Sequence, residues 1–150
     1  MKLRVIGLAA LLLFSTFSLA ADTDRKHIVD APSEARNALP FSDGVLVGNT
    51  LYVAGHLGLD KTGKPPASAE EEATLAMDAI KGTVEHAGLT MDDIVTVQVF
   101  CSDLSQYDTF NKVYRSYFHD QFPARAFIGA GSLLRGAKFE VLAIAVKKGM

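Results

Sequence analysis

The strongest pattern in the chain is a helical spacing of apolar side chains between residues 68 and 88. Ser68 followed by Glu71 is typical of a capping box at a helix N-terminus, and Gly88 fits a C-terminal stop. The apolar positions between them are Ala73, Ala76, Met77, Ile80, Val84 and Ala87. Because these positions keep the period of one helix face, the segment predicts an amphipathic helix that packs on another element.

Apolar patterns on both sides of this helix predict strands. Val45 and Val47 alternate, Gly48-Asn49 supplies a turn, and residues 51–53 return, which together indicate a β-hairpin. Residues 94–101 are apolar on both faces except at two polar positions. A strand that is apolar on both faces is typical of the centre of a sheet.

A second helix is expected over about residues 105–118, with Pro123 ending the helical region. Two further strands are expected over about residues 125–130 and 137–147. One side of the second helix is mostly aromatic, which favours a place in the core over a stacking platform for a ligand. The residues on this side are Tyr107, Phe110, Val113, Tyr114 and Tyr117.

The element order β-β-α-β-α-β-β predicts an α+β sandwich, with one sheet and two helices on one face. The other face of the sheet carries apolar residues that need a cover. With so few elements in the chain, a second copy of the same chain is the natural candidate.

The first twenty residues have the composition of a secretory signal peptide. Lys2 and Arg4 form a positive start, residues 5–13 are apolar, and the segment Ser18-Leu19-Ala20 supplies the small residues that a signal peptidase needs. An uncleaved anchor is the alternative, but the apolar stretch is short for a membrane span. We therefore expect a signal peptide over residues 1–20, a flexible lead-in over 21–38 and one domain over 39–150. The mature protein is expected to be exported, either periplasmic or secreted.

Composition narrows the classes of function. The chain has 15 Lys and Arg against 17 Asp and Glu, with no basic run, so neither nucleic acid nor an anionic membrane is an expected partner. His27, His56, His86 and His119 lack metal-like spacing, and no phosphate-binding glycine loop is present. We therefore expect no cofactor and no metal. Cys101 stands alone, which excludes an internal disulfide, and its apolar strand predicts a buried thiol.

Two charged residues interrupt the apolar runs of the last two predicted strands. Arg125 lies in the run 122–128, and Glu140 lies in the run 137–146. Burying a charge without a partner costs several kcal/mol. If these strands form a hairpin through residues 131–136, a symmetric register places Glu140 opposite Arg125 on one face. The two would then form either a structural ion pair or a site for a small carboxylate, which the planar fork of an arginine suits.

Six segments, in this order, resemble the RidA (YjgF-like) family of reactive intermediate deaminases. The resemblance covers nearly the whole mature chain. The segments are Leu39-Pro40-Phe41-Ser42, Tyr52-Val53-Ala54-Gly55-His56-Leu57-Gly58, Leu89-Thr90-Met91-Asp92-Asp93-Ile94-Val95, Phe110-Asn111-Lys112-Val113-Tyr114, Phe122-Pro123-Ala124-Arg125 and Phe139-Glu140-Val141-Leu142-Ala143-Ile144-Ala145.

The resemblance implies a chorismate-mutase-like fold that assembles as a homotrimer with three clefts between subunits. It also implies cofactor-independent hydrolysis of enamines and imines of amino acids to 2-oxo acids and ammonia. Arg125 matches the arginine that binds the substrate carboxylate, and Glu140 matches the glutamate of the cleft. Asn111 and Gly55 match positions near the same cleft. In this mechanism Arg125 would hold the carboxylate, while Glu140 would orient or deprotonate the attacking water.

Four positions depart from the residues that are frequent in the family. Phe41 replaces a tyrosine, Ala54 a serine, Phe127 a cysteine and His56 a glutamine. These changes make the expected pocket drier and narrower, although His56 offers an additional proton carrier. Two alternatives to catalysis stay open at this point: a protein that binds small carboxylates without turnover, and a stress-related interaction protein on the same trimeric scaffold.

Overall fold

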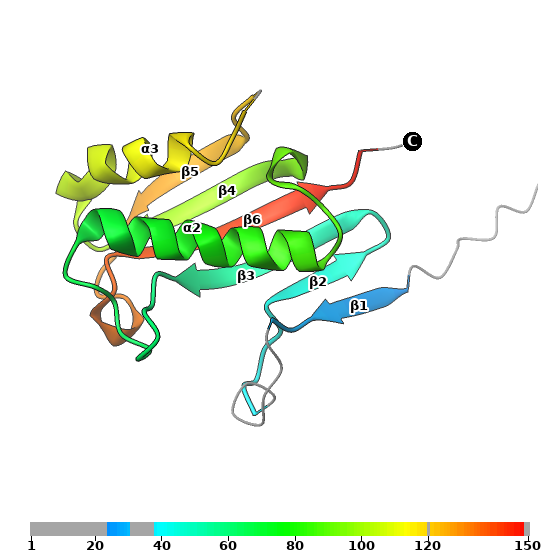
Figure 1. Ribbon diagram of the computed structural model, residues 1–150, viewed down its shortest axis with the longest axis horizontal. Helices are drawn as coiled ribbons and strands as arrows, with labels where there is room; N and C mark the ends of the chain where they lie inside the picture. Colours follow the sequence, from blue (N-terminus) through cyan, green and yellow to red (C-terminus); the bar gives the residue numbers. More distant parts are fainter. Residues whose placement is uncertain (1–23, 31–37, 120, 149–150) are drawn as a thin grey trace, which may run out of the picture.

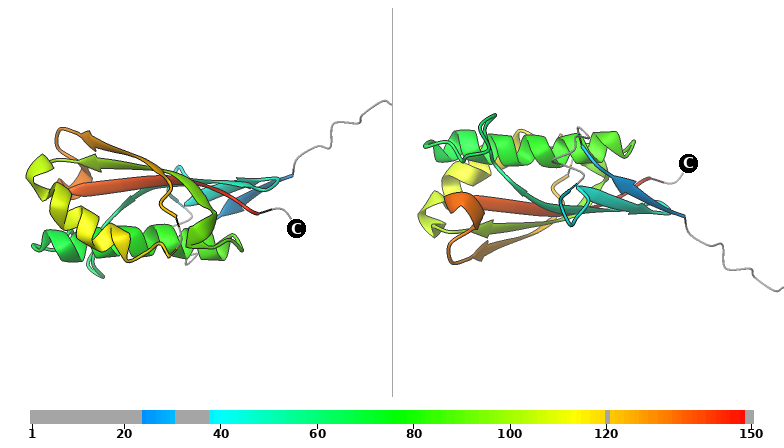
Figure 2. Two further views of the ribbon diagram at one scale, coloured as in Figure 1. Left: turned by 90° about the horizontal axis from the view of Figure 1, so that it is seen from above. Right: turned by 90° about the horizontal axis from the view of Figure 1, so that it is seen from below.

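A six-stranded mixed sheet carries two α-helices on one of its faces (Figures 1 and 2). The computed structural model describes residues 24–30, 38–119 and 121–148, so the expected signal peptide lies outside the described residues. The sheet order is β1-β2-β3-β6-β4-β5, with β4 and β5 parallel and the other neighbours antiparallel. The elements are β1 (Arg25–Ile28), β2 (Gly44–Val47), β3 (Thr50–Leu57), α2 (Ala69–His86), β4 (Ile94–Cys101), α3 (Tyr107–Arg115), β5 (Ala124–Gly129) and β6 (Phe139–Val146). The predicted α+β class and the single mixed sheet with helices on one face are confirmed.

Helix α2 begins and ends where its sequence predicts. The hydroxyl of Ser68 accepts a hydrogen bond from the backbone N–H of Glu71 at 3.3 Å. Gly88 has φ of +80°, a conformation in which any side chain is strained, so the helix stops there. The apolar side of α2 packs on the sheet, with Ala73, Ala76, Met77, Ile80 and Val84 fully buried.

Helix α3 is shorter than predicted at both ends: a 3-10 turn over Leu104–Gln106 precedes it, and the helix ends at Arg115. Phe110, Val113 and Tyr114 are buried, which confirms that this aromatic side belongs mainly to the core. Tyr107 is 44% exposed and lies at the rim of the core, where its ring contacts Phe127.

The predicted flexible lead-in contains a strand that the sequence pattern missed. Arg25–Ile28 forms β1 and pairs antiparallel with β2 at the edge of the sheet. Ile28 is only 1% exposed, whereas the other three side chains of the strand are polar and exposed. A single apolar residue gives no periodicity, so the prediction of a flexible segment is wrong for these four residues.

The last two strands do not form the predicted hairpin. β4 lies between them, with β5 parallel on one side and β6 antiparallel on the other. The chain leaves β5 with a hydrogen bond from Ala130 N to Cys101 O (2.8 Å) and enters β6 with one from Ser102 N to Lys138 O (3.0 Å). The connection therefore passes the end of β4. The predicted register, with Glu140 opposite Arg125, is wrong.

The two faces of the sheet differ in cover. Figure 2 shows both helices on one side, and the residues of β6 alternate between buried positions toward the helices and half-buried ones on the open side. The open side has a shallow hollow, lined by Tyr52, Val53, Thr96, Gln98, Leu142, Ala143 and Ile144. Tyr52 is 51% exposed there, so the apolar face that the sequence predicts is present and lacks a cover in the single chain.

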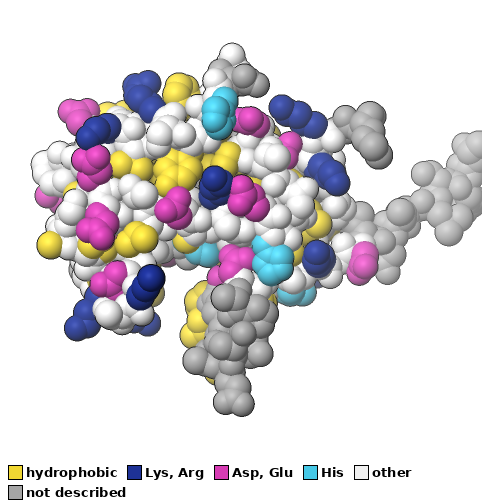
Figure 3. Space-filling view, viewed as in Figure 1, with side chains coloured by type: hydrophobic (Ala, Val, Ile, Leu, Met, Phe, Trp, Pro, Cys, Tyr) yellow, Lys and Arg dark blue, Asp and Glu magenta, His cyan; other side chains and the backbone are white. Residues whose placement is uncertain are grey.

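The helix side of the molecule has interspersed acidic and basic side chains (Figure 3). Within the described parts of the chain, no helix is both long and apolar enough to cross a bilayer.

Candidate active site

The guanidinium of Arg125 lies in an aromatic pocket on the helix side of the sheet. Its Cζ is 4.5 Å from the ring centroid of Tyr114, 5.6 Å from that of Phe127 and 5.9 Å from that of Tyr107. Its Nη2 donates a hydrogen bond to Oδ1 of Asn111 at 2.6 Å. Across the described residues, no carboxylate pairs with this half-buried cation. The arrangement fixes the orientation of the guanidinium and leaves most of its N–H donors available to an anion.

The pocket results from the packing of helix α3 against β5. Its lining consists of Asn111, Tyr114, Arg115, Phe122, Pro123 and Arg125, around a hollow of ≈ 270 Å³. Tyr114 is 4% exposed, and burial raises its pKa to about 12 against the opposing effect of the Arg125 charge. Its hydroxyl is buried and has no hydrogen-bond partner among the described residues. The wall beside the guanidinium is therefore neutral and aromatic.

Glu140 points to the opposite face of the sheet from Arg125. Residues that pair directly across neighbouring strands point to the same face, and successive residues alternate. Arg125 pairs with Val97, which is buried toward the helices, whereas Glu140 pairs with Phe100 on the open side. The two charges cannot form an ion pair within one chain. The interpretation of Arg125 and Glu140 as a structural ion pair is therefore wrong for the single chain.

Gly55 and Glu140 lie against each other. The pairing of β3 with β6 is irregular between Val53 and His56, and Gly55 lies inside this irregularity. A Cβ at Gly55 would be 2.3 Å from Oε1 of Glu140, closer than atoms tolerate. The absence of a side chain at position 55 therefore makes room for the carboxylate of Glu140. Ala54, the preceding residue, is half-buried.

His56 points toward helix α2 and away from the face that carries Glu140. Its Nε2 lies 3.3 Å from Oγ1 of Thr83, which is fully buried. Thr83 also donates a hydrogen bond to Asp30, and the other carboxylate oxygen of Asp30 lies 2.9 Å from Nδ1 of His86. These residues come from three separate segments, β3, α2 and the residues after β1, and no local pattern in the sequence indicates their association. The structure does not bring His56 together with Glu140 as a proton carrier.

Phe41 lies near the edge of the sheet opposite to the edge strand that carries Arg125. It is 54% exposed and lines a separate hollow with His27 and Ser42, beside β1 and β2. Because β1 and β2 are at one edge of the sheet and β5 is at the other, Phe41 and Arg125 cannot line one pocket in a single chain.

Phe127 belongs to the aromatic cluster around Arg125. Its ring makes edge-to-face contacts with Tyr107 (4.9 Å between centroids) and Phe110 (5.5 Å). These contacts continue into the core through Phe110 and Phe139, whose centroids are 5.0 Å apart. Phe127 therefore supports the pocket by packing and offers it no hydrogen-bonding group.

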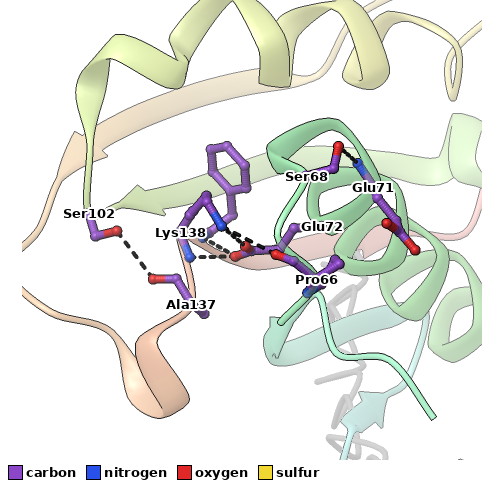
Figure 4. A network of polar contacts seen from close by, with 8 residues as sticks. Pro66, Ser68, Glu71, Glu72, Ser102, Ala137 and Lys138 are labelled. Atoms are coloured by element: carbon purple, nitrogen blue, oxygen red, sulfur yellow. Dashed lines mark hydrogen bonds and ion pairs between the residues drawn. The ribbon is translucent and has the colours of Figure 1, made fainter. Parts of the chain in front are cut away.

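A buried glutamate holds the start of β6, directly before Glu140 (Figure 4). Glu72 of α2 is 0% exposed, and its Oε1 accepts hydrogen bonds from the backbone N–H groups of Lys138 and Phe139. Its Oε2 lies 3.1 Å from Nζ of Lys138. The sequence signal for this network is weak: Glu72 stands next to the apolar side of the predicted helix, but its partners follow only from the fold.

A protein-family model described as Endoribonuclease L-PSP matches residues 31–147. The chain belongs to this family, also known as the RidA/YjgF family. Two relatives are each 36% identical to it and carry the name 2-iminobutanoate/2-iminopropanoate deaminase. The protein from Bos taurus aligns over 72% of this chain and 80% of its own length, and that from Escherichia coli K12 over 73% and 88%.

Solved structures of the RidA/YjgF family have the same fold. The YjgF gene product of E. coli is 35% identical, with a TM-score of 0.74 over 82% of this chain and 99% of its own. E. coli TdcF, solved with bound serine, is 28% identical, with a TM-score of 0.71 over 84% and 98%. The predicted family and fold are confirmed.

Proposed function

We propose that this RidA/YjgF protein hydrolyses 2-imino acids, and the enamines that tautomerise to them, to 2-oxo acids and ammonia without a cofactor. The observation that carries the proposal is the guanidinium of Arg125, which is oriented by Asn111 and by aromatic rings and has no acidic partner among the described residues. A planar carboxylate is the anion that this fork binds best. The names of the relatives from Bos taurus and E. coli support the choice of imino acids.

We propose further that the site is completed by assembly as a homotrimer. Arg125 and Glu140 point to opposite faces of one sheet, so one chain alone cannot present both to a substrate. The uncovered apolar face beside Glu140 supports an assembly in which this face meets another copy. A cleft between two copies would then join the Arg125 pocket of one to Gly55, Glu140 and Phe41 of the other.

In this cleft, Arg125 holds the carboxylate and fixes the position of the imino carbon. Glu140 of the neighbouring copy orients a water and accepts a proton as the oxygen bonds to that carbon. Glu140 returns this proton to the nitrogen of the tetrahedral carbinolamine, and the C–N bond breaks as the C=O bond of the 2-oxo acid forms. The proton of the former carbinolamine hydroxyl then passes through Glu140 to the released ammonia. Iminium acid and water thus become 2-oxo acid and ammonium, with no change of oxidation state.

The test is hydrolysis of 2-iminobutanoate, generated freshly in the assay by an amino acid oxidase. We expect Arg125→Ala to lower kcat/KM by about a hundredfold, because the substrate loses its anchor. Arg135→Ala is the control, since Arg135 is an exposed arginine whose Nη1 donates to the carbonyl of Gly63. Wild-type turnover in Arg125→Ala, or loss of its assembled state in light scattering, would contradict the assigned role of Arg125.

A second candidate function is carboxylate binding without turnover. Phe127 favours it, because this ring occupies the position at which family members often carry a cysteine, and it gives the pocket no polar group. Calorimetric titration with 2-oxobutanoate separates the two functions. Binding that depends on Arg125, together with no hydrolysis of any imino acid, would establish the binding protein and reject the deaminase.

We also propose that the chain is exported and that, once its signal peptide is removed, it binds neither nucleic acid nor membrane. The positive start, the apolar run and the small residues before position 21 support export. Imino acids outside the inner membrane would come from flavin-dependent oxidation of amino acids. Mass spectrometry of the purified protein should find an N-terminus at residue 21 or 22, whereas a full-length chain confined to the cytoplasm would contradict export.

A further inference from the structure

We infer that Arg115 forms a second anion subsite beside Arg125, so that the preferred substrates are 2-imino acids with a second carboxylate. This inference rests on the proposed function and specifies its substrate class. Both arginines line the same hollow of ≈ 270 Å³, and no acidic side chain is among the described residues that line it. A hollow that two arginines line, without a carboxylate among its described neighbours, is chemically suited to a dianion.

The two guanidinium groups share one aromatic wall. Cζ of Arg115 lies 5.7 Å from the ring centroid of Phe122, and Cζ of Arg125 lies 4.5 Å from that of Tyr114. The rings of Tyr114 and Phe122 are nearly parallel, at 24°, with centroids 6.3 Å apart. Each cation is thus placed by one member of a stacked pair, which holds both at the border of the same hollow.

Arg115 is also free to bind a ligand. Within the described residues its guanidinium makes no hydrogen bond and no ion pair, and only the contact with Phe122 orients it. Lys112, on the same helix, differs in this respect, because its Nζ lies 2.9 Å from Oε1 of Glu70. Arg115, which borders the Arg125 pocket, has no acidic partner in the part of the chain that the structure describes, whereas Lys112 has one.

A structural role accounts for only part of this arrangement. A cation in the last turn of α3 interacts favourably with the helix dipole, and Arg115 occupies that turn. That role needs a positive charge at the helix end, but it does not need the charge to border the hollow that holds Arg125. Two like charges around one hollow repel each other, and an anion between them offsets this repulsion.

The size of the substrate follows from bond lengths. The terminal carboxyl carbons of an extended four-carbon diacid are about 4 Å apart, and those of a five-carbon diacid are about 5 Å apart. Either molecule is small enough for the hollow beside Arg125. The 1-carboxylate would bind Arg125, as in the proposed mechanism, while the distal carboxylate would bind Arg115.

The kinetic test compares 2-iminoglutarate with 2-iminobutanoate, both generated in the assay by amino acid oxidases. We expect the ratio of kcat/KM for the diacid to that for the monoacid to fall about fivefold in Arg115→Gln, as for the loss of one partly exposed ion pair. Arg115→Lys, which keeps the charge, should retain part of the ratio. Lys112→Gln removes a charge from the same helix away from the hollow and should leave the ratio unchanged. An unchanged ratio in Arg115→Gln would overturn the inference.

A binding measurement separates this inference from the proposed function. Calorimetry gives the Kd of 2-oxoglutarate and of 2-oxobutanoate for the wild-type protein, Arg115→Gln and Lys112→Gln. If no imino acid is hydrolysed but 2-oxoglutarate binds about fivefold more weakly to Arg115→Gln alone, the subsite stands and the deaminase falls. If imino acids are hydrolysed but neither the kinetic nor the binding preference depends on Arg115, the deaminase stands and the subsite falls.

Discussion

Burial decides what the single thiol of this chain can do. Cys101 is 0% exposed at the end of β4, and its Sγ lies 3.0 Å from the carbonyl oxygen of Asp103. Desolvation raises the pKa of this thiol, and the negative charges of Asp103 and Glu72 act in the same direction. The thiolate, which is the reactive form, is therefore scarce in the folded protein even at mildly alkaline pH.

We predict that the folded protein reacts slowly with Ellman's reagent at pH 8 and rapidly once urea unfolds it. Because the folded pKa is raised, the stability that comes from the protonated thiol is present below the unfolded pKa and decreases as pH rises through the folded one. A non-reducing gel should show no disulfide-linked dimer, even for protein recovered from an oxidising compartment. Rapid labelling of the folded chain would contradict this burial.

The sequence identifies a residue of the candidate site where a charged side chain interrupts an apolar run. Arg125 stands out for this reason, and the structure places it in a pocket with an available guanidinium. Its neighbours Tyr114 and Phe122 give no such signal, because an aromatic residue fits a core and a pocket wall equally well. The link between His56 and Thr83 joins distant segments, and no local rule of sequence predicts it.

Among the elements, the start of β6 depends most on a single side chain of α2. We predict that Glu72→Ala lowers the free energy of unfolding by about 3 kcal/mol, because two backbone N–H groups and Lys138 lose their acceptor. Chemical denaturation at fixed protein concentration measures the change. Glu71→Ala is the matched control: this neighbour is exposed, and the variant should differ from wild type by less than about 0.5 kcal/mol. An equal loss in both variants would mean that the loss of a negative charge in the first turn of α2, and not the buried network, is responsible.

The sequence predicts which strands exist better than it predicts their neighbours. The two apolar runs near the C-terminus form β5 and β6 as expected, but β4 lies between them. Two strands that are adjacent along the chain are expected to form a hairpin. In the fold, however, β4 accepts one of them at each of its edges, and this pairing is a tertiary feature that neither strand's own sequence indicates. The existence of a strand is encoded locally, whereas its partner depends on how the helices pack over the sheet.

At the scale of the whole molecule, the described chain presents two incomplete parts of a site. The Arg125 pocket is on the helix side near β5, while Glu140 and Gly55 are on the open side. The family and fold could be predicted from ordered segments of the sequence. The separation of Arg125 and Glu140 onto opposite sides of the sheet could not be predicted, because it follows from the strand order, which local sequence patterns do not indicate.

This division has a consequence for genetics. If each cleft takes Arg125 from one copy and Glu140 from another, two inactive chains can complement each other. Arg125→Ala and Glu140→Gln, each inactive alone, should regain about a quarter of wild-type turnover when unfolded together in equal amounts and refolded, since about one cleft in four combines both intact residues. In the control, the two folded variants are mixed without unfolding, so any activity that they recover comes from exchange of subunits between assembled proteins. Failure of the co-refolded mixture to recover activity would place both residues in a site that one copy completes alone.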